Sequence, residues 1–393
     1  MTLADTLSPL PSAPRLQTLV AAAALTMLAL IAWRAAAFGW RMPVLAVVGA
    51  GLGAALYFAT FGFSSAYRRL FVLRETRGAE AHVLLLALTT LLIAPLLARG
   101  EIFGQALYGA IAPAGVQVAV GAFLFGIGMQ LGGGCASGTL YTAGSGNVRM
   151  VVTLVAFCAG AFWASLHLGF WTTTPHLSPI TLSRELGWPG AVALQFGIFA
   201  AVWLGLRRLG RHTDVVSPQL RAKSLWRGPW PLLWGVLALA VLNAVTLVVA
   251  GHTWVITWGY TLWGAKAAAL LGWTPAAGDL WSGGYFSSAL TASPLADTVS
   301  IMNIGILVGA LLAVGLAGSW SPGWRIPPRS LAAAVIGGLL LGYGARIAFG
   351  CNIGAFISGI ASTSLHGWLW ILCALPGNWV GLKLRPAFGL SRA

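Results

Sequence analysis

Charged side chains are scarce in this 393-residue sequence. They make up 8% of it, and only 8 residues are Asp or Glu. An ordinary soluble domain is about 25% charged. The hydrophobic fraction here is 58%, with a mean hydropathy of +0.84. The shortage of charge excludes a soluble globular protein. The few carboxylates are expected in loops, so we expect no carboxylate relay for protons.

Cysteine and histidine are also few, with 4 Cys and 6 His. No CxxC, HxxxH or Cys/His cluster occurs, so we expect no metal and no cofactor. A membrane disulfide generator needs closely spaced cysteine pairs in outer loops, whereas Cys158 and Cys373 lie inside apolar runs and are interpreted as packing residues. No GxSG motif of an intramembrane serine protease is present either.

Long apolar runs dominate the rest of the sequence. Each is about 20 residues long, which is the length of helix that crosses ~30 Å of hydrocarbon. A β-barrel would instead show shorter alternating segments. The sequence therefore predicts an all-α polytopic membrane protein of about ten transmembrane helices. The predicted spans are 16–33, 43–66, 81–98, 104–130, 150–170, 188–206, 229–250, 299–318, 330–349 and 365–383.

The formal net charge of +15 comes from basic residues that lie mostly in short loops. Such loops face the cytoplasm under the positive-inside rule. We therefore expect the basic residues to contact membrane lipid, and we expect no nucleic-acid partner. The basic loops at 68–77 and 207–227 are both predicted to be cytoplasmic, together with the N-terminus and the Cys135 loop. No cleavable signal peptide is expected ahead of the span at 16–33.

The apolar run at 253–272 decides the topology of the second half. If it spans, Arg325, Arg329 and Lys383 fall outside, against the positive-inside rule; if it re-enters, they fall inside. The re-entrant alternative gives two halves of opposite orientation, an architecture common in transporters. The predicted units are an extra N-terminal helix at 1–41, a first half at 42–206, a basic linker at 207–228 and a second half at 229–393.

An internal repeat supports two halves. GAFLFGIGMQLGGGCASG (121–138) matches GGLLLGYGARIAFGCNIG (337–354) at six small or reactive positions. Cys158 and Cys373 follow at matching distances once one gap is allowed. Since the chain has so few cysteines, their coincidence indicates a duplication rather than shared glycine packing. The matched pairs are Gly121 with Gly337, Gly126 with Gly342, Gly128 with Gly344, Gly134 with Gly350, Cys135 with Cys351, and Gly138 with Gly354.

The two Gly-Cys segments are too rich in glycine to continue as regular helix in lipid, so we expect them in short or re-entrant helices along a cavity. Backbone N–H groups beside Cys135 and Cys351 would favour an anion, and a thiol is a weak donor suited to a sulfur-containing solute. Gly134, Gly138, Gly350 and Gly354 would bring that backbone close. Arg346, a cation inside apolar sequence, is assigned a role near the anion. For Lys266, a functional role and snorkelling of the side chain to the membrane interface are equally favoured.

These motifs resemble the YeeE/YedE sulfur-transport family. The strings GGGCASGTLYTAGSGN and GYGARIAFGCNIGAFISGIASTSLHGW carry the resemblance, which covers about residues 42–384. It implies a multi-pass permease of the bacterial inner membrane whose two thiols, here Cys135 and Cys351, line the constriction. It also implies import of thiosulfate, or of other sulfur or selenium compounds, beside a TusA-like sulfur-carrier protein.

One position departs from the family. Thiosulfate-importing members resemble this chain at FGFSSAYRRLF but carry a third cysteine where Gly62 stands. Either two thiols suffice, with Ser64 or Ser65 contributing hydroxyls, or the solute differs.

The sequence therefore predicts a permease, not an enzyme, that imports a small sulfur-containing anion, with thiosulfate as first choice. Two alternatives stay open: a membrane sulfurtransferase that forms a persulfide on Cys135 or Cys351, and a membrane anchor for a soluble carrier. No Na⁺ site or ATP-binding motif identifies an energy source.

Overall fold

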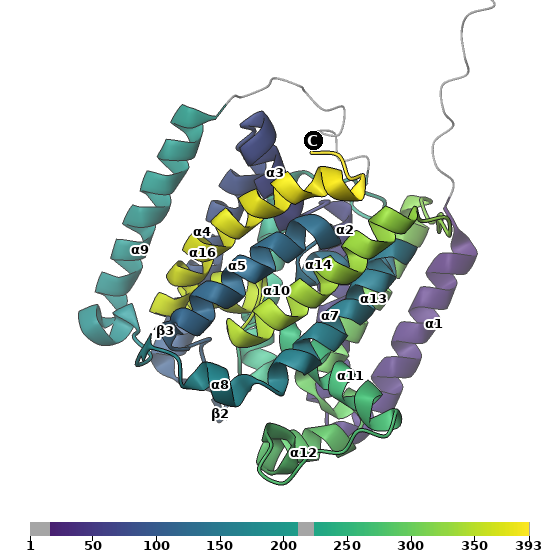
Figure 1. Ribbon diagram of the computed structural model, residues 1–393, viewed down its shortest axis with the longest axis horizontal. Coiled ribbons are helices and arrows are strands. Elements are labelled where there is room, and N and C mark those ends of the chain that lie inside the picture. The colour runs from purple at the N-terminus through teal and green to yellow at the C-terminus, as the bar shows by residue number, and fades with distance from the viewer. Residues whose placement is uncertain (1–15, 211–223, 393) are drawn as a thin grey trace, which may run out of the picture.

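The computed structural model describes residues 16–210 and 224–392, which form a bundle of long helices (Figure 1). Within these residues, nine helical stretches are long and apolar enough to cross a membrane, and α16 adds a further helix of 20 residues. The prediction of an all-α polytopic membrane protein with about ten spans is confirmed. Most of the predicted basic linker, at 211–223, lies outside the described residues.

The elements follow one another with short connections. The α-helices are α1 (Thr18–Ala35), α2 (Arg41–Phe58), α3 (Phe63–Leu73), α4 (Arg77–Arg99), α5 (Val116–Gly132), α6 (Ala136–Gly144), α7 (Val148–Ser165), α8 (Leu168–Thr172), α9 (Leu182–Leu209), α10 (Leu232–Ala250), α11 (Thr257–Leu270), α12 (Gly284–Thr291), α13 (Thr298–Ala317), α14 (Pro328–Ile347), α15 (Ser358–Ala361) and α16 (Leu365–Leu384). A π-helical segment, η5 (Asn352–Ile357), precedes α15. The 3₁₀ segments are η1 (Ala36–Phe38), η3 (Leu280–Ser282), η4 (Pro294–Ala296) and η6 (Arg385–Phe388). The strands are β1 (Glu101–Ile102), β2 (Gln105–Ala106), β3 (Ala114–Gly115) and β4 (His176–Leu177), and β1 pairs with β2 and β3 with β4, both antiparallel.

Two glycine-rich helices, α5 and α14, lie side by side and antiparallel, with α16 packed on α5 and α7 on α14 (Figure 1). At their contact, a Cβ on Gly121 would meet the Gly344 carbonyl oxygen at 2.6 Å, and one on Gly128 would meet that of Gly337 at 2.8 Å. Only glycine permits backbones to approach this closely. In sequence register, Gly121 corresponds to Gly337 and Gly128 to Gly344, so each contact is the counterpart of the other.

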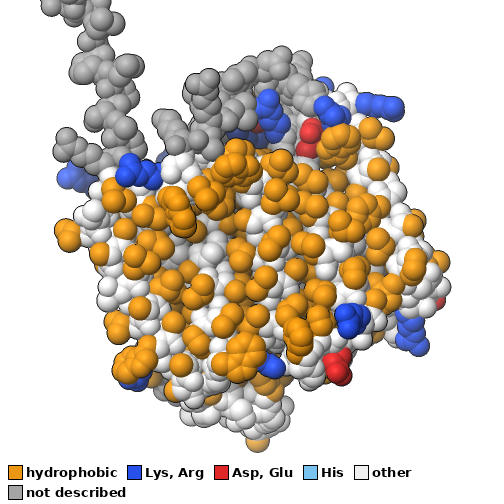
Figure 2. Space-filling view, turned by 180° about the vertical axis from the view of Figure 1, so that it is seen from behind, with side chains coloured by type: hydrophobic (Ala, Val, Ile, Leu, Met, Phe, Trp, Pro, Cys, Tyr) orange, Lys and Arg blue, Asp and Glu red, His pale blue; other side chains and the backbone are white. Residues whose placement is uncertain are grey.

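The outer helices complete the bundle in pairs. Helix α2 packs against α13, and α4 against α10. Helices α1 and α9 lie on opposite flanks of the bundle (Figure 1). Figure 2 shows apolar side chains spread over one broad face, with charged side chains gathered toward its upper and lower edges. This distribution suits a surface that contacts lipid tails in the middle and water at both ends.

The two ends of the bundle differ, and we name them by the helices that they carry. The α3 end contains α3 and the C-terminal segment, and the α12 end contains α8 and α12 (Figure 1). The α3 end is the basic one. It carries Arg68, Arg69, Arg74, Arg77, Arg149, Arg227, Arg325, Arg329, Lys383 and Arg385.

Two predicted spans are wrong in their bounds. The span at 43–66 breaks after α2 ends at Phe58: Thr60 takes a φ of 46°, and α3 begins only at Phe63. The span at 104–130 shortens to α5 because β2 and β3 occupy its first residues, where Pro113 cannot donate a hydrogen bond within a helix. Averaging hydropathy over a window conceals both breaks.

The run at 253–272 enters and leaves the bundle at the same end. After α10 ends, the chain returns inward through Trp254, which is 1% exposed, and α11 then leads back toward α12. His252, before this excursion, and Tyr285, after it, line one cavity at the α12 end. Helix α11 has only 14 residues, too few to cross ~30 Å. The re-entrant alternative thus describes the structure.

Candidate functional site

The Cys135 segment turns sharply between α5 and α6. Gly133 ends α5 with a φ of 94°, and Cys135 then occupies the N-cap of α6. The Cys135 sulfur accepts the Gly138 N–H at 3.4 Å and lies 3.3 Å from the Ser137 hydroxyl. Its side chain is 1% exposed. The thiol is therefore held at the start of a helix, where backbone N–H groups and the helix dipole favour negative charge.

The Cys351 segment repeats this arrangement between α14 and η5. Gly350 has a φ of 149°, and Cys351 is the N-cap residue of η5. The Cys351 sulfur accepts the Ile353 N–H at 3.4 Å. The Cys351 carbonyl oxygen accepts the Ala355 N–H at 2.9 Å. The Cys135 carbonyl accepts the equivalent Thr139 N–H at 2.8 Å. Cys351 is fully buried.

The glycine before each thiol has the same neighbours. A Cβ on Gly134 would lie 3.2 Å from the Gly138 carbonyl carbon, and one on Gly350 would lie 3.1 Å from that of Gly354. Each first glycine thus lets the chain fold back onto the helix that follows the thiol. The second glycines differ: Gly138 faces the Cys135 sulfur and Gly354 faces Val255.

Tyrosine side chains connect the two thiols. Tyr260 in α11 donates its hydroxyl to the Ala136 carbonyl at 2.8 Å and lies within electrostatic range of both Cys135 and Cys351. Tyr67 in α3 is likewise close to Cys135 and to the side chain of Asn352. The two Gly-Cys segments therefore meet in one buried region rather than at separate ends of the molecule.

Several buried polar atoms have few hydrogen-bond partners. The Tyr67 hydroxyl and both polar atoms of the Asn352 side chain make no hydrogen bond of standard geometry and lie close to each other, and the Gln130 Oε1 in α5 also has no partner. Asn352 and Gln130 are fully buried, and Tyr67 is 4% exposed. Buried polar groups are normally paired, so a cluster with so few partners indicates a place for a polar ligand or water. Sequence reasoning missed these residues, although Asn352 adjoins Cys351 in the GCNIG string.

The other predicted site residues lie around this region. The Ser64 hydroxyl donates to the Met129 carbonyl at 2.8 Å and is buried at the end of α5. Arg346, in the last turn of α14, places its guanidinium 5.8 Å from the centre of the Trp258 ring, and its Nε has no partner. No described carboxylate is paired with Arg346.

Three further residues weighed from the sequence have structural contacts. Lys266 donates to the Leu290 carbonyl at 2.7 Å and so fastens the end of α12. Arg149 donates to the Gly132 carbonyl at 2.7 Å and caps the end of α5. His366 is paired with the Ser364 hydroxyl at 2.8 Å. Within 16–210 and 224–392, no group of three or more His, Cys, Asp or Glu residues is placed to hold a metal ion.

Cavities open at both ends of the bundle. The cavity at the α12 end has a volume of about 620 Å³ and reaches Val255, which adjoins Gly354. Its lining contains Asp297 and His252 but no Lys or Arg. Cavities at the α3 end of about 550 Å³ and 490 Å³ contain Arg227 in the first and Arg149 and Arg325 in the second. Electrostatics thus favour an anion at the α3 end.

A protein-family model described as sulphur transport matches residues 58–380, which include both Gly-Cys segments. The chain belongs to the sulphur transport family. The resemblance inferred from the Gly-Cys motifs is thereby confirmed. The match begins at the end of α2 and leaves α1 outside the family model.

Members of the sulphur transport family with curated names are similar to this chain. The thiosulfate transporter TsuA of Escherichia coli is 25% identical over 85% of the chain and 91% of its own length. The thiosulfate transporter TsuA of Spirochaeta thermophila is 29% identical over 66% of the chain and 74% of its own length. The probable transporter YedE of Escherichia coli is 32% identical, but the match spans 39% of its length and 40% of this chain.

Proposed function

We propose that this chain is a permease, without catalytic activity, that carries a small sulfur-containing anion, with thiosulfate as first choice, into the bacterial cytoplasm. The observation that carries the proposal is the meeting of two buried thiols, each at a helix N-cap, among polar groups with few partners between cavities at both ends. Membership of the sulphur transport family and the names of the TsuA relatives support it.

The hydrogen bonds at the thiols explain how such an anion passes. In both segments the sulfur accepts a backbone N–H. The Cys351 S–H is left to donate to an anion, and the Cys135 S–H shares a hydrogen bond with the Ser137 hydroxyl, which an anion would replace. A thiol is a weak donor with little cost of desolvation, so it can contact an anion without holding it tightly. The Tyr67 hydroxyl and the Asn352 amide supply further donors. Conduction requires this combination of adequate binding and easy release.

We further propose that the halves 42–206 and 229–393 are inverted repeats, joined by the linker at 207–228 and preceded by the extra helix at 1–41. The reciprocal contacts of Gly121 with Gly344 and of Gly128 with Gly337 support this arrangement, as do the matched bonds at Cys135 and Cys351. A two-fold axis between α5 and α14 would relate them. Arg346 would then contribute its unpaired charge to the anion path from the α12 side.

The charge distribution supports the orientation of the permease. We assign the basic α3 end to the cytoplasm and the α12 end to the periplasm, with lipid around the flanks and the inner membrane as location. A TusA-like sulfur carrier at the cytoplasmic end is part of the proposal and rests on the resemblance alone.

A sulfurtransferase is less well supported. A persulfide on Cys135 or Cys351 would have to reach an acceptor protein, and both thiols are buried with exposed fractions of 1% and 0%. Burial disfavours the thiolate, which is the reactive form. Another sulfur or selenium anion remains the alternative solute, because Gly62 replaces a thiol expected from the resemblance.

The test is growth of a sulfate-uptake-deficient bacterium on thiosulfate as sole sulfur source. Wild type and Cys158→Ser, the matched control, are expected to rescue growth, whereas Cys135→Ser and Cys351→Ser are not. Equal rescue by all four would exclude the thiol path. No rescue by well-expressed wild type would exclude thiosulfate as the solute.

A further inference from the structure

A third cavity at the α3 end lies between α3, α4 and the start of α10. The sequence motifs point to Gly62 and Ser65 on its wall, but not to the charged side chains beside them. The volume of the cavity is about 200 Å³. Its lining contains four ionisable side chains, those of Arg69, Glu75, Arg77 and His82. Gly62 and Ser65 line it as well.

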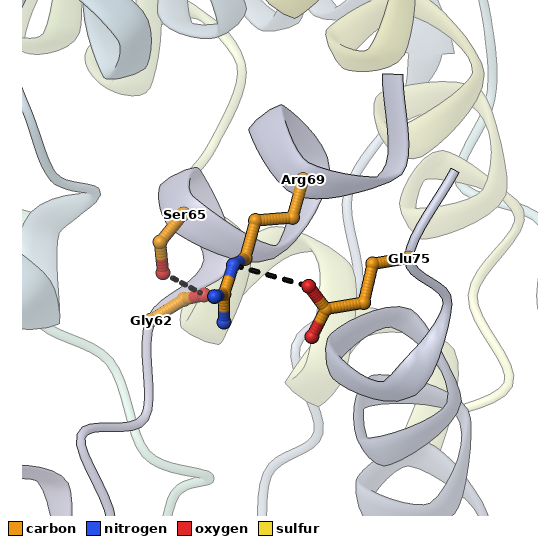
Figure 3. Close-up of polar contacts among 4 residues, drawn as sticks. All are labelled: Gly62, Ser65, Arg69 and Glu75. Carbon is orange, nitrogen blue, oxygen red and sulfur yellow. Dashed lines mark hydrogen bonds and ion pairs between the residues drawn. The ribbon is translucent and has the colours of Figure 1, made fainter. Parts of the chain in front are cut away.

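An ion pair lies on one side of this cavity. The Arg69 Nε is 3.2 Å from a Glu75 carboxylate oxygen, and Figure 3 shows the two side chains meeting beside Gly62 and Ser65. It is the only ion pair between side chains found within the described part of the chain. Arg69 is 59% exposed, so solvent screens the pair and it is easily exchanged for another.

His82 gives an independent indication of a ligand. Its side chain is 4% exposed, and its Nδ1 has no hydrogen-bond partner. The ring is held by aromatic neighbours instead: it stacks on Phe63 with 4.1 Å between centres and meets Phe61 and Tyr67 edge-on. A buried imidazole fixed in position without a polar partner is costly unless something else pairs with it.

The backbone at this cavity also favours negative charge. Gly62 is the N-cap of α3 and provides no side-chain cap, so the first N–H groups of an 11-residue helix lack that partner. The Ser65 hydroxyl donates to the Gly62 carbonyl at 3.1 Å. Arg77, the first residue of α4, also lines the cavity. The dipole of α3, two guanidinium groups and the free imidazole therefore surround the same space.

We propose that this cavity is the cytoplasmic release site for the transported oxyanion, and that Glu75 competes with the anion for Arg69. The inference rests on the proposed transport function and adds a site to it. Helix α3 connects the two regions, because Tyr67 lies close to Cys135 and Asn352 while Ser65 and Arg69 line the cavity. An anion that leaves the thiols meets Arg69 and His82, and return of Glu75 to Arg69 then expels it.

The test measures ³⁵S-thiosulfate binding to the purified full-length protein in detergent, and uptake into proteoliposomes, for wild type and four variants. Glu75→Gln removes the competitor, so we expect it to bind about tenfold tighter and turn over more slowly. Arg69→Gln and His82→Phe, which keeps the aromatic packing, should bind several-fold more weakly. Arg74→Gln is the matched control: it removes a positive charge from the same loop, at an exposed residue that does not line the cavity.

The outcomes separate this site from the transport function. A gain in affinity for Glu75→Gln cannot come from misfolding. If Glu75→Gln shows no such gain and Arg69→Gln binds thiosulfate as wild type does, the release site is overturned. Uptake by wild type would in that case still support transport. If wild type binds thiosulfate with these variant effects but shows no uptake, the site stands and the permease proposal fails. If wild type does not bind thiosulfate, the site is overturned.

Discussion

Cysteine replaces the usual N-cap residue at both Gly-Cys segments. Ser, Thr, Asp and Asn are preferred at N-caps because their oxygen atoms accept backbone N–H groups well. Cys135 and Cys351 each accept one such N–H at 3.4 Å, an ordinary distance for sulfur, but sulfur is a weak acceptor. Both segments thus give up capping strength in return for a soft S–H group facing the interior.

Replacing either thiol by a hydroxyl should therefore leave the fold intact. We expect Cys135→Ser and Cys351→Ser to melt at or slightly above the wild-type temperature, because serine is the better cap. Thermal unfolding in detergent, followed by size-exclusion fluorescence, measures this. A marked drop in melting temperature would mean that lost growth reflects lost protein rather than a lost sulfur contact.

Tyr67 offers a complementary test at the level of one atom. Its hydroxyl is buried with no hydrogen bond of standard geometry and only the Asn352 side chain as a nearby partner, so Tyr67→Phe loses at most this weak contact and removes a desolvation cost of about 1–3 kcal/mol. We expect unchanged or higher thermal stability together with slower thiosulfate uptake. Lower stability with normal uptake would instead assign the hydroxyl a structural role.

At the level of elements, the sequence predicts the two thiols but not their surroundings. Cys135 and Cys351 stand out because the repeat pairs them within glycine-rich strings. Tyr67, Tyr260 and Asn352 matter only because α3, α11 and η5 meet, which no local pattern reveals. The helix breaks before α3 and α5 escaped detection for a related reason: apolar segments outside helices raise the same hydropathy average.

The glycines of the Gly-Cys segments should differ in their tolerance of a methyl group. Gly350→Ala combines a φ of 149° with a Cβ only 2.7 Å from the Ala355 nitrogen, so we expect a loss of about 1–3 kcal/mol or more. Gly134→Ala, whose Cβ has contacts at 3.2 Å, should lose less stability. Gly138→Ala, whose Cβ lies 3.5 Å from the Cys135 sulfur, should lose the least.

The matched control for this series is Gly197→Ala in α9, where nothing lies within 4 Å of the added methyl group. Its melting temperature should equal or exceed that of wild type, because alanine favours helix over glycine. An inverted ranking in thermal unfolding, with Gly138→Ala the least stable, would contradict the geometry of the two segments.

At the scale of the whole molecule, positive charge and the re-entrant α11 together support the proposed orientation. The charge pattern already favoured re-entry, and the short α11 beside a shared cavity provides the geometric reason. The sequence could not predict that the two Gly-Cys segments meet, because their meeting depends on how α5 and α14 pack together.

The orientation predicts which residues an impermeant reagent reaches. We expect Ser282→Cys, exposed at the α12 end, to react with a membrane-impermeant maleimide on spheroplasts. Ser319→Cys, exposed at the α3 end, should react only after the membrane is opened. Wild type, whose four cysteines are partly or wholly buried, is the background control. Labelling of Ser319→Cys in intact spheroplasts would reverse the orientation.

The glycine packing between α5 and α14 also constrains how such a chain can evolve. Under the proposed duplication, each copy would ordinarily be free to drift. Here Gly121 packs against Gly344 and Gly128 against Gly337, so each of these contacts joins the two proposed halves. A larger side chain on one half collides with the backbone of the other, and a side-chain change in the second half cannot relieve it. These glycines can therefore not be lost from either half, however far the other surfaces of the halves diverge.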